Sequence, residues 1–140
     1  MTDPELAKQN LPGHSLCLCK NGTLITDDGR GISPMMRFIA QGRDLSGFSA
    51  ADIIVGKAAA MLFVKAGIKE VYAKTISVAG AEFLRSNGIP FEYGTMTEKI
   101  VNRQGTDICP MEKAVADIID TEKGYIALKK RLDEMNAARG

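Results

Sequence analysis

The stretch NRQGTDICPMEKAV, residues 102–115, holds the densest group of side chains in this sequence that could do chemistry. Cys109 precedes Pro110, a residue that favours the first turn of a helix, so Cys109 is expected at the N-cap and Glu112 at the third helical position. The positive end of a helix can lower the pKa of a thiol, and the thiolate is the nucleophilic form. A nearby carboxylate opposes this effect. Cys109 and Glu112 are therefore the candidate catalytic residues.

The same segment also fits a structural role. Cys-Pro-Met-Glu has the spacing of a capping box, with Cys109 in the place usually taken by serine or threonine and Glu112 reaching back to the N-cap. Serine or threonine would cap the helix better, which favours a reason for the cysteine beyond capping. The sequence leaves both the reactive and the structural interpretation of Cys109 open.

Five other residues are candidate ligand contacts. Gly56 and Lys57 stand at the expected start of an apolar helix, where free backbone N–H groups attract anions and a lysine adds positive charge. Asn102 and Arg103 lie on a polar loop, and an arginine presents a rigid fork to phosphate or carboxylate. Ser77 is expected mainly to cap the next helix. The alternatives are a salt-bridged Lys57 and loop-ordering hydrogen bonds from Asn102 and Arg103.

Composition narrows the function classes. Of the 140 residues, 45% are hydrophobic and 25% charged, and 18 basic against 17 acidic side chains leave a net charge of +1. This balance argues against electrostatic binding to nucleic acid or to a membrane surface. No apolar run approaches the roughly 20 residues that span a bilayer, and the N-terminus lacks the pattern of a signal peptide. We therefore expect a cytoplasmic protein.

The three cysteines do not suggest disulfides or a metal site. Cys17 and Cys19 alternate on a predicted strand and are expected in the core, where free cysteine is common. A zinc site from His14, Cys17, Cys19 and Cys109 is conceivable, but a C-x-C pair on a strand is not the usual zinc-binding spacing. The sequence predicts neither a metal nor a cofactor.

Apolar patterning predicts strands alternating with helices. Asn21-Gly22 between two apolar runs is the favoured two-residue turn of a β-hairpin. Ser33 is expected to cap a helix that begins at Pro34 and closes at Gly42. Further strands and helices follow in the order strand 51–55, helix 57–66, strand 69–76, helix 78–86, strand 89–94 and a helix from residue 110. This order predicts a three-layer α/β/α domain, a mixed sheet with an antiparallel hairpin and parallel later strands.

The two ends of the chain are expected outside this domain. Residues 1–13 are predicted to form a loosely attached tail, and residues 14–121 the α/β domain. Gly124 is expected to break the helical pattern, so that residues 122–140 form a separate C-terminal helical extension. The apolar stripe of that extension is expected to pack over the domain edge, with contact to a partner as the alternative.

The stretches GRGISPMM, VGKAAAML, KTIS and NRQGTDICPMEKAV resemble a family of uncharacterised bacterial and archaeal proteins with a cytidine deaminase-like fold. The resemblance covers about residues 15–120 and implies the fold without a reaction. Zinc deaminases of this fold open one helix with His-x-Glu and another with Pro-Cys-x-x-Cys. The corresponding helices here open with SPMM and GKAAA. Zinc-dependent deamination is therefore not expected.

Three functions remain open. The first is metal-free binding of a small anionic or nucleotide-like molecule at the carboxyl ends of the strands, through Lys57, Asn102, Arg103, Ser77 and Gly56. The second is an enzyme that acts on such a ligand with Cys109 and Glu112. The third is a non-catalytic interaction or assembly module. Because deaminase-like folds often self-associate, a homo-oligomer is an expectation by analogy.

Overall fold

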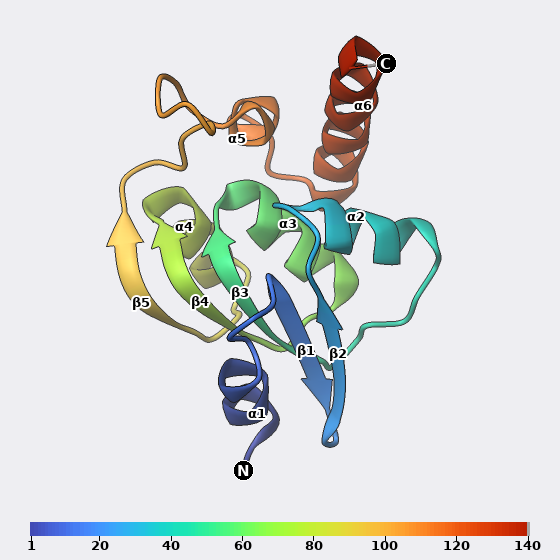
Figure 1. Cartoon of the computed structure of the whole chain (residues 1–140), viewed down its shortest axis with the longest axis vertical. Coiled ribbons are helices and arrows are strands. Elements are labelled where there is room, and N and C mark those ends of the chain that lie inside the picture. The colour runs from blue at the N-terminus through green and yellow to red at the C-terminus, as the bar shows by residue number, and fades with distance from the viewer. Residues whose placement is uncertain (140) are drawn as a thin grey trace.

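The protein is built around one five-stranded mixed sheet (Figure 1). The computed structural model describes residues 1–139. The strands are β1 (Leu16–Lys20), β2 (Thr23–Asp27), β3 (Ser49–Val55), β4 (Glu70–Ser77) and β5 (Phe91–Thr97), in the spatial order β2-β1-β3-β4-β5. β1 is antiparallel to both β2 and β3, whereas β3, β4 and β5 are parallel. The predicted mixed sheet and α/β class are confirmed.

The β1–β2 hairpin forms where the sequence predicts it. Asn21 and Gly22 both have positive φ, 50° and 80°, as a tight two-residue turn requires. Lys20 pairs with Thr23 directly across this turn. The turn therefore fixes the register of the hairpin.

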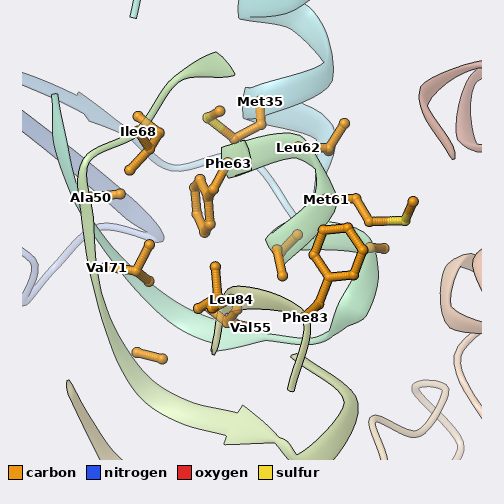
Figure 2. Close-up of a cluster of buried hydrophobic side chains, with 14 of the residues drawn as sticks. Met35, Ala50, Val55, Met61, Leu62, Phe63, Ile68, Val71, Phe83 and Leu84 are labelled. Atoms are coloured by element: carbon orange, nitrogen blue, oxygen red, sulfur yellow. The ribbon is translucent and has the colours of Figure 1, made fainter. Parts of the chain in front are cut away.

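Three helices cover one face of the sheet. They are α2 (Ser33–Ala40), α3 (Lys57–Ala66) and α4 (Val78–Ser86), and their apolar sides meet the strands in the main core, part of which is drawn in Figure 2. Phe63 of α3 and Leu84 of α4 are fully buried there. One local prediction was wrong, because Ile32 occupies the N-cap of α2 and Ser33 is already its first residue.

The first helix, α1 (Asp3–Gln9), covers part of the opposite face (Figure 1). Ala7 is fully buried in a second, smaller apolar cluster, which also contains Leu11, Cys17, Cys19 and Ala51. The Asp3 carboxylate accepts hydrogen bonds from the Asn21 and Gly22 N–H groups of the hairpin turn. The prediction of a loosely attached tail over residues 1–13 was therefore wrong.

Two helices end the chain, α5 (Pro110–Val115) and α6 (Thr121–Arg139). Gly124 does not break the helical pattern but lies inside the first turns of α6, so the expected helix break was wrong. A Cβ at Gly124 would lie 3.0 Å from Met61 Sδ, so the glycine allows α6 to approach α3 closely. No helix within residues 1–139 is long and apolar enough to cross a membrane.

Packing of α6 on the domain rests on its apolar stripe. Leu128 is fully buried in the main core, whereas Ile126 on the same helix is 63% exposed. We expect Leu128→Ala to lower the free energy of unfolding by about 2–5 kcal/mol, because it leaves a cavity. Ile126→Ala is expected to change it by less than about 0.5 kcal/mol. Urea denaturation measures both, and equal effects would show that α6 is not docked through Leu128.

Candidate functional site

The N-terminus of α3 is capped by a side chain from far along the sequence. The Glu112 carboxylate on α5 accepts hydrogen bonds from the backbone N–H groups of Lys57 and Ala58, at 2.8 Å each, across about 55 residues. These are N–H groups that the first turn of a helix leaves unpaired, and a carboxylate also complements the helix dipole there. A Cβ at Gly56 would overlap the Glu112 carboxylate, so any other residue here would force this carboxylate to shift.

Lys57 makes a second contact between the two helices, from α3 to α5. Its Nζ donates to the Ala116 carbonyl at the end of α5, at 2.9 Å. The two residues therefore tie α3 and α5 together, and we call Lys57 and Glu112 the α3–α5 clasp. The groups expected to attract a ligand at Gly56 and Lys57 are engaged by the protein itself.

Cys109 stands at the N-cap of α5, as predicted, but does not act as a cap. Its side chain forms no capping hydrogen bond, and the half-buried thiol packs against the main core. The predicted capping box is wrong, because Glu112 turns away from its own helix to α3. Both Glu112 oxygens accept N–H groups in this arrangement, and a catalytic role for Cys109 and Glu112 stays a prediction.

Of the remaining predicted ligand contacts, Asn102 and Ser77 form hydrogen bonds within the protein. Asn102 orders its loop, accepting from Thr106 N–H at 3.0 Å and donating to Thr106 Oγ1 at 3.2 Å. Ser77 is buried and accepts from Gly80 N–H at 3.0 Å as the N-cap of α4. Arg103 is exposed on the loop. Ligand contact by these residues stays a prediction, and Asn102 borders a cavity.

That cavity is a groove of about 310 Å³ between the loop after β5, α5 and α6, which we call the α5–α6 groove. Figure 1 shows these three segments above the carboxyl ends of the parallel strands. Polar and charged side chains alternate with apolar ones along it. The lining residues are Asn102, Asp107, Ile108, Pro110, Lys113, Ala114 and Arg131.

Two cations and one carboxylate set the charge of the α5–α6 groove. Lys113 is paired with Asp107, and this hydrogen bond, with a further one from the Ile108 N–H, lowers the pKa of Asp107. Arg131 is partly buried and has no ion-pair partner within residues 1–139. The groove therefore carries a net positive charge. Lys113 and Arg131 were missed because only the folded chain brings α5 and α6 together.

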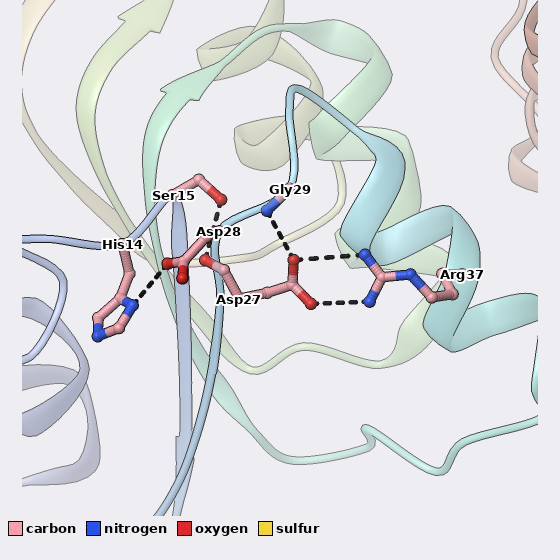
Figure 3. A network of polar contacts seen from close by, with 6 residues as sticks. All are labelled: His14, Ser15, Asp27, Asp28, Gly29 and Arg37. Carbon is pink, nitrogen blue, oxygen red and sulfur yellow. Dashed lines mark hydrogen bonds and ion pairs between the residues drawn. The ribbon is translucent and has the colours of Figure 1, made fainter.

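A second polar group surrounds the start of α2 (Figure 3). The Asp27 carboxylate accepts from Arg37 and from the Gly29 N–H, and the hydrogen bond from Arg37 is the main cause of its lowered pKa. His14 Nδ1 lies 2.6 Å from Asp28 Oδ1. These contacts hold the loop between β2 and α2 against the sheet.

Asp52 is a buried carboxylate that sequence reasoning missed. It lies in β3 between Leu16 of β1 and Ala73 of β4, and only 9% of its surface is exposed. Burial raises its pKa from 3.8 to about 7, against the smaller effect of the Ile53 and Ile54 backbone N–H groups. The stretch ADIIV was interpreted as an apolar buried strand, so Asp52 was not singled out as a candidate residue.

The residues weighed for zinc do not converge. Cys17 and Cys19 lie under α1, whereas Cys109 packs against the main core on the other face of the sheet, and His14 is paired with Asp28. Within residues 1–139, no three His, Cys, Asp or Glu side chains are arranged to hold a metal ion.

Comparison with known proteins places the chain in a family. The sequence profile of the TM1506 family, a domain of unknown function also designated DUF1893, matches residues 5–132. The chain belongs to the DUF1893 family. The crystal structure of a DUF1893 protein from Thermotoga maritima superimposes with a TM-score of 0.74 at 25% identity, over 86% of this chain and 80% of that one.

Two further solved structures resemble the DUF1893 chain more weakly. A dCMP deaminase from the cyanophage S-TIM5 matches with a TM-score of 0.44 at 17% identity, over 64% of this chain and 90% of that one. A Thermotoga maritima diaminohydroxyphosphoribosylaminopyrimidine deaminase/reductase matches at 0.45 and 20% identity, over 66% and 34% of the two chains. No curated protein matches the sequence. The expected family of unknown function is confirmed.

Proposed function

We propose that this DUF1893 protein binds a small anionic molecule, a carboxylate or a phosphate ester, in the α5–α6 groove. The observation that carries the proposal is Arg131, a partly buried arginine that lines the groove and has no ion-pair partner within residues 1–139. An arginine offers two parallel N–H donors that match a carboxylate or phosphate. An anion there gains charge-assisted hydrogen bonds without the loss of an existing ion pair.

The size and lining of the α5–α6 groove favour a small polar ligand. Its volume of about 310 Å³ is at the low end for small-molecule pockets, which suits a sugar phosphate or part of a nucleotide. Lys113 Nζ adds a second cation, and Ile108, Pro110 and Ala114 supply an apolar surface. The amide of Asn102 supports the rim through its bonds to Thr106.

The α3 N-terminus supports this proposal less well than the α5–α6 groove. In zinc deaminases a helix of this fold opens with the zinc-binding Pro-Cys-x-x-Cys. In this chain Gly56 and Lys57 stand at such a helix start, and Glu112 already accepts hydrogen bonds from its free N–H groups. A ligand at this position would have to displace a carboxylate of the protein, whereas Arg131 has no such competitor.

Replacing Arg131 tests the proposal. We expect wild-type protein to bind inorganic phosphate, ribose 5-phosphate or AMP in isothermal titration calorimetry. Arg131→Gln is expected to weaken that binding by about 10-fold or more, since a hydrogen bond to a charged group contributes about 1.5–3 kcal/mol. Arg85→Gln is the matched control, because Arg85 is an exposed arginine on α4 outside the groove lining.

The control also defines the contrary result. Equal losses in Arg131→Gln and Arg85→Gln would indicate non-specific attraction to positive charge, and the groove would not be the site. No binding of any of the three anions by the wild type would also contradict the proposal. Circular dichroism of each variant checks that the fold is retained.

An assembly module is the second candidate function, favoured by one observation. β5 lies at the edge of the sheet and has no strand beyond it within residues 1–139. Five consecutive residues of this strand, 92–96, are exposed. Such an edge offers unpaired backbone groups to another chain.

A further inference from the structure

The free edge of β5 has few of the features that usually protect a sheet edge. Protective features include inward-pointing charges, lysines, prolines within the strand, bulges and covering loops. β5 (Phe91–Thr97) contains no lysine or proline, and Glu92 is its only charged residue. Its pairing with β4 is regular from Val71–Phe91 to Ser77–Thr97. Figure 1 shows no described element on the outer side of this strand.

Apolar side chains gather along the same edge. Tyr93 and Met96 of β5 are 46% and 39% exposed, and Val101 in the following loop is 54% exposed. Tyr93 stacks on Phe91, with ring centroids 6.3 Å apart, so these two rings share the face of β5 that bears α4. The edge therefore combines unpaired backbone with exposed apolar surface, the combination that strand pairing would cover.

We propose that β5 pairs with β5 of a second copy of this chain, antiparallel and about a two-fold axis near Gly94, to give one continuous sheet across a homodimer. All seven residues of the strand take part only in the register that places Gly94 opposite Gly94 of the partner copy. Directly opposite residues of an antiparallel pair lie on the same face of the sheet. This register therefore keeps the α2–α4 layer of both copies on one side.

Side-chain chemistry is compatible with the same register. Glu92 lies opposite Met96 of the other copy, so the one charge of each strand faces an apolar residue and not its own copy. Tyr93 lies opposite Thr95, and aromatic and β-branched residues form favourable cross-strand pairs. Both contacts occur twice because of the two-fold axis. A second copy is thus a complementary occupant of the edge.

The other edge of the sheet is less suited to this pairing. β2 (Thr23–Asp27) has five residues, and its last residue holds Arg37 in the ion pair drawn in Figure 3. Leu24 is its exposed large apolar residue, at 41%. Leu24 therefore provides a matched control position on the opposite edge.

Charge changes at Met96 test both the dimer and its register. Sedimentation velocity over a concentration series is expected to show a reversible dimer for the wild type. Met96→Glu places two like-charged pairs across the two-fold axis, opposite Glu92, and is expected to raise the dimer dissociation constant by about 10-fold or more. Met96→Lys places opposite charges there and is expected to leave the dimer as tight as the wild type or tighter. Leu24→Glu is expected to change nothing.

A reversed pair completes the test. The double variant Glu92→Lys/Met96→Glu is expected to recover the dimer that Met96→Glu loses, since each glutamate then faces a lysine. A wild type that stays monomeric at the highest attainable concentration would overturn the proposal. So would equal weakening by Met96→Glu and Met96→Lys, because that result shows a loss of apolar area with no opposing Glu92. The three substituted positions, Leu24, Glu92 and Met96, are exposed, and circular dichroism verifies folding.

Discussion

Replacing Glu112 with alanine is expected to lower the free energy of unfolding by about 2–4 kcal/mol. The change removes two hydrogen bonds from a charged acceptor and leaves the Lys57 and Ala58 N–H groups without a partner at the start of a largely buried helix. It also removes one of the two polar links between α5 and α3, so that Lys57 and the buried Met111 and Val115 side chains remain to hold the two helices together. Chemical denaturation in urea, followed by circular dichroism, measures the loss.

Two further variants separate the α3–α5 clasp from a general effect of charge. Glu112→Gln keeps one acceptor oxygen and is expected to lose about half as much stability as the alanine variant. Glu82→Ala removes an exposed glutamate from α4 and is expected to change the free energy of unfolding by less than about 0.5 kcal/mol. If Glu112→Ala were no more destabilising than Glu82→Ala, Glu112 would not cap α3 in solution.

Asp52→Asn is expected to stabilise the protein above pH 7 and to have no such effect near pH 4. Burial raises the pKa of Asp52 from 3.8 to about 7, so the folded state binds this proton more tightly than the unfolded state. The stability that the protonated carboxyl allows is fully present below the unfolded pKa and is lost as the pH rises through about 7. The shift corresponds to at most about 4 kcal/mol.

The difference between variant and wild type isolates this residue. Melting temperatures of both proteins across pH 4–8 should diverge as the pH rises, with Asp52→Asn the more stable at the upper end. Asp117→Asn, at an exposed position, serves as the control and should follow the wild type. Parallel curves for Asp52→Asn and the wild type would show that Asp52 does not titrate between its unfolded pKa and neutrality.

Local sequence signals predicted the fold well where one short segment determines its own shape. Asn21-Gly22 predicted the hairpin because both positions adopt positive φ. Gly67 ends α3 in the left-handed conformation, as its place after the helix indicates. The alternation of strands and helices along the chain predicted the mixed sheet with parallel later strands.

Long-range contacts explain what the sequence did not predict. α1 is ordered because Asp3 reaches the hairpin turn and Ala7 fits under it against the sheet, and neither partner lies near in sequence. Gly124 lies within α6, where the lack of a side chain leaves room for Met61 of α3. In each case a propensity read from one segment yields to packing against another segment.

The candidate site likewise has one part that local sequence signals predicted and one part that only long-range contacts create. Cys109 and Glu112 were correctly placed at a helix start, but the partners of Glu112 lie about 55 residues away and could not be read from its neighbours. Arg131 lies among the charged residues of α6 and gives no local signal of a cavity. A role for it appears only once α5 and the loop after β5 pack beside α6.

Mapping an anion onto the backbone amides tests the central claim most directly. In a titration of ¹⁵N-labelled protein with inorganic phosphate, we predict chemical-shift changes at the amides of Asn102, Lys113 and Arg131, around the α5–α6 groove. The Lys57 and Ala58 amides should stay unchanged, because Glu112 occupies them. Shifts confined to Lys57 and Ala58 would contradict the account and place the anion at the N-terminus of α3.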